Sequence, residues 1–155
     1  MGWSGICIEP QSDIFSKLCE NRTAECVNCA VADSNGKRDF LKVGYADMLS
    51  GLTENFDPKH IDRILLEGDP DTTQTVSVEC KRFADIIGSQ EIIDFLSIDT
   101  EGSEFEILKS INFDKVRFRC IAVENNYQNR MIYNFLKSKG YDLKFVAGDE
   151  IYVGS

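Results

Sequence analysis

Residues 92–108 read IIDFLSIDTEGSEFEIL, and this stretch decides the fold class of the chain. Residues 92–99 form an apolar run that ends in an acid, which predicts a strand buried on both faces, as in a parallel sheet. Ser103 and Glu106 have the spacing of a helix capping box, and an apolar helix face follows them. A buried strand joined to a helix by a short acidic turn is a building unit of α/β folds.

The same alternation continues outward in both directions. Ser12 is predicted to cap a first helix, and Gly140 to end the last one. Short apolar runs predict strands at 5–9, 24–32, 74–80 and 118–124, a short extra strand at 38–43, and a closing antiparallel hairpin at 141–147 and 150–153. The order predicts one α/β domain over residues 1–155 with a mostly parallel sheet.

Residues 44–75 interrupt this alternation with an acid-rich segment that holds prolines and glycines. A short helix is predicted inside it, with Asp57 as N-cap, Pro58 at the first helical position and an end near Leu66. A long connection inside a small domain is usually functional, so we interpret it as an insertion or lid. A surface insertion without a role is the alternative.

Composition excludes several classes of function. The 155 residues carry a net charge of −9, which argues against nucleic acid and anionic membranes as partners. No apolar run is long enough for a membrane span, and MGWSGICIEP lacks the basic start of a signal peptide. The six cysteines fall in apolar surroundings, which is typical of free thiols in a reducing compartment. We therefore expect a cytoplasmic protein.

Acidic residues end three of the predicted strands: Glu9, Asp99 with Glu101, and Glu124. Ligands of open α/β sheets bind at the carboxyl ends of the strands, so these acids are candidates for one binding rim. Each could equally cap a neighbouring helix. Asp99 and Glu101 favour function more strongly, because Gly102 and a capped helix follow them directly.

Isolated signals carry less weight. His60 is the only histidine, and we interpret it as an exposed helix residue, with a general base or substrate contact as the alternative. Cys26 and Cys29 resemble half a zinc site, but residues i and i+3 of a strand point to opposite faces. The chain holds neither a nucleophile elbow nor a Walker loop.

The order and spacing of the segments resemble the FkbM-type methyltransferase family over nearly the whole chain. SIDTEGSEFEIL at 97–108 resembles its D-x-E-G-x-E signature, and GICIEP at 5–10 its second strand with the ribose-side acid. The other similar segments are NCAVADSNG at 28–36, DMLSGL at 47–52, DPKHIDRI at 57–64, VSVECKRFADII at 76–87, IAVENN at 121–126 and KGYDL at 139–143.

This resemblance implies S-adenosylmethionine as methyl donor and an oxygen of a sugar, glycolipid or small molecule as acceptor. It implies a Rossmann-like methyltransferase sheet with an antiparallel C-terminal hairpin. Glu9 and Pro10 would hold the ribose of the donor, and Ala30 and Val31 would lie beside its adenine.

The resemblance also implies roles near the acceptor. Asp99 would face the sulfonium and the acceptor, and Glu101 would shape the pocket behind it. Asp99, Glu101 and His60 are therefore the candidate catalytic residues. We expect no metal, because Asp99 and Glu124 without a histidine ligand would form a weak oxygen site.

Family members begin with a strand and a glycine-rich donor loop, and the sequence is expected to lack both. The edges of residues 5–9 and 94–99 would then be open. We expect the two strands to pair directly; the alternative is a second copy or a partner chain that covers the gap. Direct pairing would narrow the donor pocket, so weak donor binding is predicted. A truncated, non-catalytic binding or interaction module is the second hypothesis.

Two placements follow from this interpretation. Glu9 and Asp99 should lie on the same rim, at the carboxyl ends of neighbouring strands, and face one cavity. Residues 44–75 should lie over the rim that carries Asp99.

Overall fold

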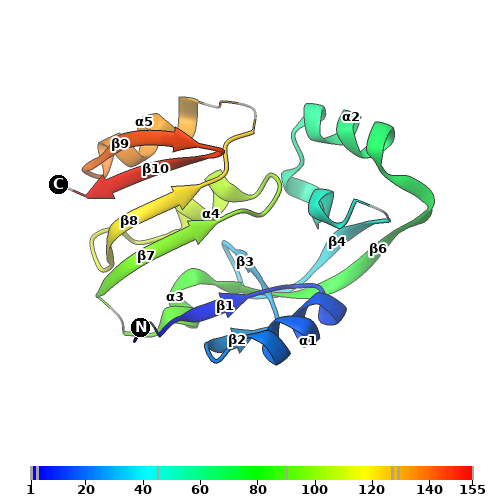
Figure 1. Ribbon diagram of the computed structural model, residues 1–155, viewed down its shortest axis with the longest axis horizontal. Helices are drawn as coiled ribbons and strands as arrows, with labels where there is room; N and C mark the ends of the chain where they lie inside the picture. The colour runs from blue at the N-terminus through cyan, green and yellow to red at the C-terminus, as the bar shows by residue number, and fades with distance from the viewer. Residues whose placement is uncertain are drawn as a thin grey trace.

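The computed structural model describes residues 2, 4–44, 46–89, 91–126, 128 and 130–154. Within them the strands form three separate sheets, as Figure 1 shows. The strands, in the order of each sheet, are β1 (Ile6–Ile8) and β2 (Glu25–Val27); β7 (Ile92–Ile98), β8 (Arg117–Val123), β10 (Asp149–Gly154) and β9 (Tyr141–Ala147); and β3 (Ala30–Ala32), β6 (Asp69–Arg82), β4 (Gly36–Gly44) and β5 (Gly51–Leu52).

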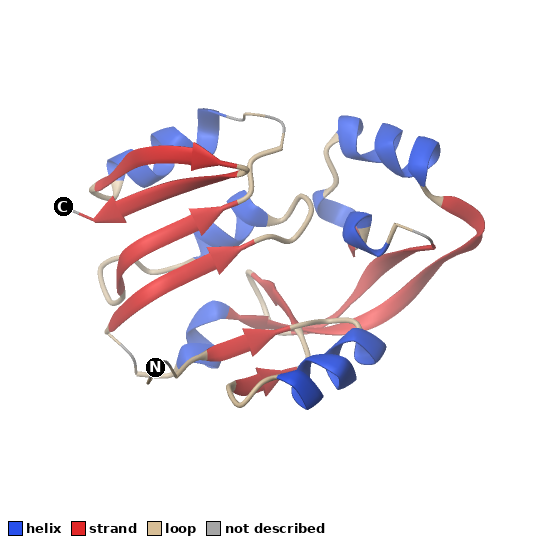
Figure 2. Cartoon of the chain, in the orientation of Figure 1, coloured by secondary structure: helices blue, strands red, loops and turns tan. Residues whose placement is uncertain are grey.

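Helices connect and cover these sheets (Figure 2). They are α1 (Ser12–Asn21), α2 (Pro58–Glu67), α3 (Phe83–Ile87), α4 (Glu104–Ser110) and α5 (Arg130–Ser138), with the short 3₁₀ turns η1 (Asp47–Leu49) and η2 (Thr53–Asn55). No helix in the described part of the chain is long and apolar enough to cross a membrane.

The α/β class and the closing hairpin β9–β10 are confirmed, but a single, mostly parallel sheet is not. Among the described residues, β1–β2, β3–β6 and β7–β8 are parallel, whereas β4–β5, β4–β6, β8–β10 and β9–β10 are antiparallel. The long β4–β6 pair accounts for the difference. Strand β6 begins inside the predicted insertion and pairs in parallel with β3.

The predicted strand 24–32 is interrupted, which separates two of the sheets. The amide of Cys29 donates to the carbonyl of Val27 at 3.2 Å, a tight turn that ends β2. The chain then begins β3, which pairs with the end of β6 instead of continuing beside β1. One expected strand thus becomes two strands in different sheets.

Direct pairing of residues 5–9 with 94–99 is wrong. Within the described residues β1 bonds only to β2, and β7 bonds only to β8. In the described part of the chain β1 and β2 form a sheet of their own, and the chain continues from β2 into β3 instead of returning to β7. Ile92 is 65% and Phe95 50% exposed on β7. A second copy or partner chain that covers these edges stays a prediction.

The main apolar core packs α4 and α5 against the β7–β8–β10–β9 sheet. Leu108 from α4, Ile121 from β8 and Leu136 from α5 are completely buried in it. Buried side chains of the β3–β6–β4–β5 sheet form a second, smaller apolar cluster around Phe40 and Val78. The main core also includes Phe83 of α3, so it reaches the end of β6, and the loop after β7 lies between the two large sheets (Figure 1).

Local capping follows the predictions only in part. Asp57 caps α2 as predicted, because its carboxylate accepts a hydrogen bond from the Lys59 amide at 2.8 Å. Gln11, and not Ser12, is the N-cap of α1. Ser103 caps α4 without a side-chain bond, since its hydroxyl accepts from the Asn55 amide group instead.

Asp57→Ala is expected to lower the free energy of unfolding by about 1 kcal/mol, because α2 loses its side-chain cap. Asp57→Asn should retain most of the stability, since an asparagine side chain caps a helix equally well. Urea denaturation of both variants would measure the difference. Equal losses for Ala and Asn would show that the charge of Asp57, and not its hydrogen bond, stabilises the segment.

Candidate functional site

Three acids gather at the carboxyl ends of β7 and β8. Asp99 and Glu101 follow β7, Glu124 follows β8, and one carboxylate oxygen of each lies within 4.8 Å of the others. We call Asp99, Glu101 and Glu124 the carboxylate cluster. β7 and β8 are parallel and in register up to Ile98 and Val123, so their next residues must emerge side by side. The sequence prediction that these acids share one rim is therefore met for these two strands.

The cluster holds protons that isolated carboxyl groups would release. Burial, followed by repulsion from Asp99 and Glu101, raises the pKa of Glu124 to about 8. Burial also raises the pKa of Asp99, while a hydrogen bond with Glu124 opposes that shift. Glu124 therefore keeps its proton at neutral pH and can donate it to the hydrogen bond with Asp99.

Glu101 is held in an uncommon backbone conformation that turns its side chain inward. Its φ of 54° lies in the left-handed region, and Gly102 follows at φ 122°. Its side chain is 13% exposed, and Oε2 is buried with no hydrogen-bond partner among the described residues. Burial and repulsion from Asp99 raise the pKa of Glu101 to about 7, although Arg63 opposes the shift. Glu101 is therefore half ionised near neutral pH.

The loop that carries Glu101 has its own scaffold. The carboxylate of Glu104 accepts hydrogen bonds from the Thr100 amide and hydroxyl, both at 2.9 Å, and from the Gly102 amide at 3.1 Å. Gly102 also sits close to η2, where an added Cβ would lie 3.4 Å from the Asn55 carbonyl. The role of Glu104 is not predicted by the sequence, in which Ser103 and Glu106 have the spacing of a capping box.

The structure contradicts the interpretation of His60 as an exposed helix residue. Its side chain is 1% exposed, and Nε2 lies 2.9 Å from the Leu49 carbonyl of η1. Its ring lies 4.7 Å from the ring of Phe56. Nδ1 lies 3.8 Å from Oε2 of Glu101, so the histidine connects α2 to the carboxylate cluster.

The segment 44–75 contacts the loop that follows Asp99. Arg63, one turn beyond His60 on α2, places Nη1 3.9 Å from Oε2 of Glu101. Asn55 donates to the Ser103 hydroxyl at 2.9 Å. Gly51 allows a close approach, since an added Cβ would lie 2.7 Å from the Phe56 ring and 3.4 Å from the Glu101 carbonyl. Whether the segment acts as a lid stays a prediction.

A cavity of about 650 Å³ lies beside the cluster, between η2, the loop after β7 and the start of α5. Glu101 and Glu124 line it, and so do amide side chains and the apolar side chains Phe56, Phe105 and Met131. Acids, amides and aromatic rings together suit an uncharged compound with several hydroxyl groups. His60 does not line this cavity, although it supports the residue that does.

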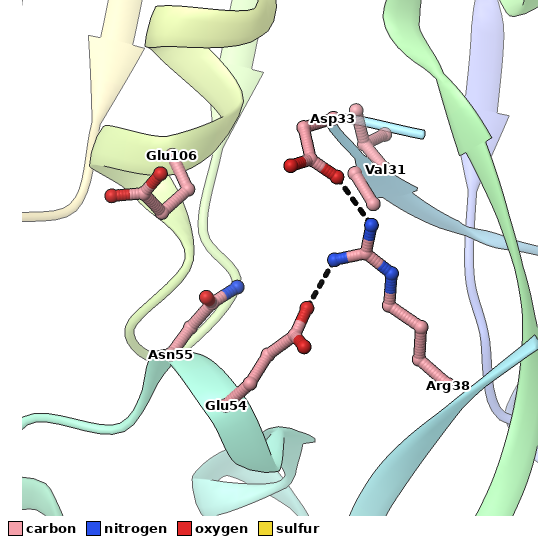
Figure 3. Close-up of a pocket in the computed structure, with 7 residues that line it drawn as sticks. Val31, Asp33, Arg38, Glu54, Asn55 and Glu106 are labelled. Carbon is pink, nitrogen blue, oxygen red and sulfur yellow. Dashed lines mark hydrogen bonds and ion pairs between the residues drawn. The ribbon is translucent and has the colours of Figure 1, made fainter. Parts of the chain in front are cut away.

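A neighbouring cavity of about 390 Å³ extends toward the end of β3. Figure 3 shows Arg38 reaching between Asp33 and Glu54, with which it forms ion pairs. Val31 lines this cavity as well. Arg38 thereby ties η2 to the end of β3. Sequence reasoning missed it, because a lone arginine in a strand carries no signal of such contacts.

The residues expected around the donor lie mainly on the turn after β1. The Glu9 carboxylate accepts from the Gln11 amide at 2.7 Å, and Asn28 donates to the carbonyls of Glu9 and Pro10 at 2.8 and 3.2 Å. Ala30 is buried in β3. Neither Glu9 nor Asp99 lines either of the two cavities described above. The prediction that Glu9 and Asp99 end neighbouring strands is wrong, because β1 and β7 belong to separate sheets.

The carboxylate cluster has the donor set of a hard cation. Carboxylate oxygens are the ligands that Mg²⁺ and Ca²⁺ prefer, and Asp99, Glu101 and Glu124 could each supply one. A bound cation would reduce the repulsion among the three carboxylates, and the hydrogen bond between Asp99 and Glu124 reduces it without a metal. The expectation of no metal stays a prediction.

The raised pKa values make the stability depend on pH. The folded chain keeps protons on Glu101 and Glu124 up to pKa values of about 7 and 8, whereas the unfolded chain releases them near 4.5. The stabilisation is therefore complete below pH 4.5 and is lost as the pH rises toward 8. We expect the melting temperature to fall from pH 5 to 8. Calorimetry on Glu101→Gln should show a smaller fall, and a steeper one would contradict this assignment.

The comparisons with known proteins give a family. The model of the methyltransferase FkbM domain matches residues 1–143. The chain belongs to the FkbM methyltransferase family. The D-x-E-G-x-E signature of the FkbM sequence pattern thus coincides with the loop that carries Asp99, Glu101 and Glu104. The searches of curated proteins and of solved structures gave no match.

Proposed function

We propose that the chain is an S-adenosylmethionine-dependent O-methyltransferase that acts on a hydroxyl group of a sugar, glycolipid or small molecule. Membership of the FkbM family supports methyl transfer. The observation that carries the proposal is the position of Glu101 on the wall of a 650 Å³ cavity, where burial raises the pKa of its carboxyl group to about 7. A general base works best when its pKa lies near the working pH, and Glu101 meets that condition.

The turn after β1 fits the ribose of the donor. Gln11 is 7% exposed, and its Oε1 is buried with no hydrogen-bond partner in the described part of the chain. Glu9 lies two residues earlier, and burial raises the pKa of its carboxyl group. Two hydroxyl groups on neighbouring carbons, as in ribose, would donate to these acceptors. The donor, when bound, supplies a methyl group on a positively charged sulfur.

The chain's own residues would supply alignment and proton transfer. The large cavity would hold the acceptor so that its hydroxyl faces Glu101, and alignment of this kind is worth about 7–11 kcal/mol in favourable cases. Glu101 would take the hydroxyl proton as the oxygen attacks. Asp99, which is hydrogen-bonded to Glu124 and repels Glu101, would act on the reaction through the charge of these two residues of the cavity wall.

His60 would act as a positioning residue in this mechanism. It is buried and does not line the cavity, but it lies 3.8 Å from Glu101. Together with Arg63 it would fix the Glu101 side chain toward the cavity. The candidate catalytic set would then divide into Glu101, which faces the reactants, and Asp99 and His60, which do not line the cavity and would act through Glu101.

The cytoplasmic location and the absence of nucleic acid partners remain part of the proposal. The net charge of −9 supports both the lack of a nucleic acid partner and the choice of an uncharged acceptor. The acids of the cavity wall outnumber Lys59 and Arg130, the basic residues that also line it, and this excess of acids disfavours an anionic acceptor.

Calorimetric titration with S-adenosylmethionine tests the donor site. We expect weak but saturable binding, because Glu9 lies outside both cavities and can contact the donor from one side only. Glu9→Ala should abolish the binding heat, whereas Glu79→Ala, an exposed acid on β6, should leave it unchanged. Equal binding by the Glu9→Ala variant would contradict the assignment of the ribose site.

A non-catalytic binding or interaction module is the second candidate, and the open edges of β1 and β7 favour it. Unpaired strand edges with apolar side chains are typical sites of strand addition. No donor binding by the wild-type chain, together with concentration-dependent self-association in sedimentation experiments, would support this candidate over the enzyme.

A further inference from the structure

The β9–β10 hairpin brings the start of β10 to the rim that carries the carboxylate cluster. β10 runs antiparallel to β8, and Glu150 lies opposite Val123, the last residue of β8. Residues that lie opposite each other in a sheet point to the same face, and so do residues two positions apart on one strand. Glu150 therefore points to the face on which Tyr152 is completely buried in the main core.

Glu150 joins this core to the loop between β8 and α5. Its Oε2 accepts a hydrogen bond from the Tyr152 hydroxyl, and its Oε1 accepts one from the side-chain amide of Asn125 at 2.8 Å. Burial, followed by the hydrogen bond to Glu150, raises the pKa of Tyr152, so the phenol keeps its proton and remains a donor. A carboxylate offers only acceptors, so the NH₂ group of Asn125 must face Glu150. The orientation of the Asn125 amide is thereby fixed from the core.

The loop that carries Asn125 is also fixed at neighbouring positions. The backbone amide of Gln128 donates to the Asn125 carbonyl at 3.0 Å, and the Asn126 side chain donates to Glu124 at 2.7 Å. The turn ends with Gln128 in the left-handed region, at φ 51°. Asn125 lines the cavity of about 650 Å³, whereas Glu150 does not.

We propose that Glu150 is a positioning residue of the acceptor site, which acts by holding the Asn125 amide group against a hydroxyl of an uncharged acceptor. This inference rests on the proposed methyl transfer and adds a residue that orients the acceptor. A ligand hydroxyl gains most from an amide that is already ordered, because little side-chain freedom is lost on binding. β10 follows residue 143, where the match to the family model ends, so family membership gives Glu150 no role.

Packing alone does not account for both hydrogen bonds of Glu150. A buried phenol needs one acceptor, and Oε2 of Glu150 meets that need for Tyr152. Oε1 instead reaches a residue of the cavity wall. Tyr152 thus anchors Glu150, and Glu150 orients Asn125. The effect of Glu150 on ligand binding should therefore pass through Asn125.

A double-mutant cycle on the full chain tests this. Saturation-transfer difference NMR with a panel of uncharged sugars and small alcohols measures binding without the methyl donor. For the compounds that bind the wild-type chain, Asn125→Ala should weaken binding about tenfold, the effect of one lost hydrogen bond. Glu150→Ala should weaken it by a similar factor, and the double variant should bind as well as Asn125→Ala alone. Glu150→Gln should restore most of the affinity, since its amide oxygen can accept from Asn125 and its NH₂ group can donate to Tyr152.

Further variants control for folding. Tyr152→Phe removes only the hydroxyl that anchors Glu150, and it should weaken binding about threefold in the wild-type chain and not at all beside Asn125→Ala. Glu79→Ala, an exposed acid on β6, should leave binding unchanged. Circular dichroism would show whether Glu150→Ala is folded; if it is not, the cycle with Tyr152→Phe decides.

The outcomes separate this inference from the proposed function. Effects of Glu150→Ala and Asn125→Ala that multiply in the double variant would show that Glu150 stabilises the fold alone, and would overturn the positioning role. A wild-type chain that binds no compound of the panel would overturn it as well. Binding that follows the cycle in a chain that transfers no methyl group would support the positioning role and refute the methyl transfer. Methyl transfer to a panel compound with multiplying effects on KM would do the reverse.

Discussion

Glu101→Gln is expected to lower the rate of methyl transfer by about 100- to 10,000-fold, the usual contribution of a positioned general base. Glutamine keeps the size and polarity of the side chain, but it cannot accept the hydroxyl proton. The wild-type rate should rise with pH through the pKa of Glu101, about 7, and the variant should lose this rise. Transfer of labelled methyl from S-adenosylmethionine to a panel of sugars and small alcohols would measure both effects.

The matched control is Glu106→Gln, the same exchange at another acid of the cavity wall. Glu106 forms an exposed ion pair with Lys109 on α4, so its replacement should change the rate less than about threefold. If Glu101→Gln retained full activity, Glu101 would not be the base. Asp99→Asn would then show whether the Asp99–Glu124 pair takes the proton instead.

The parts of the fold that depend on local pattern could be predicted from the sequence. Residues 92–108 form β7 and α4 because a buried apolar run and a helical face differ in period. The hairpin β9–β10 and the N-cap of α2 follow from glycine, aspartate and proline at fixed offsets. These signals lie within a few residues of the structure they determine.

Strand pairing could not be predicted in the same way, because it depends on residues far apart in the chain. β6 runs from Asp69 to Arg82 and pairs with both β4 and β3, although half of it lies in the expected insertion. Whether β1 joins β7 or remains with β2 depends on where β3 goes. The sequence predicts a single strand at 24–32, whereas the chain turns at Cys29, and this turn separates β2 from β3.

The candidate site likewise combines residues that local sequence predicts with residues that only tertiary packing brings together. Asp99, Glu101 and Glu124 could be predicted together, because carboxyl ends of adjacent parallel strands meet at one edge. The contacts of Arg38 and the orphaned oxygen of Gln11 arise from tertiary packing, and no sequence spacing indicates them. The burial of His60 could not be predicted, because the residues that enclose its ring, Leu49 and Phe56, belong to separate turns outside α2.

This burial changes what a substitution at His60 should do. The sequence predicts an insertion or lid over residues 44–75, but the ring of His60 within it is 1% exposed and contacts both Leu49 and Phe56. His60→Ala would leave a cavity and remove the hydrogen-bond partner of the Leu49 carbonyl. We expect the free energy of unfolding to fall by about 2–4 kcal/mol, as for a large side chain lost from a core.

Two variants separate the packing role of His60 from its position beside Glu101. Lys59→Ala, its exposed neighbour on α2, should change the free energy of unfolding by less than about 0.5 kcal/mol. His60→Gln can still donate to the Leu49 carbonyl and should recover part of the stability. Because glutamine holds Glu101 less firmly than the ring does, methyl transfer should remain low in the His60→Gln variant at temperatures where it is fully folded. Urea denaturation and transfer rates measured on the same samples would test this, and full activity of His60→Gln would show that His60 only packs α2 against η1.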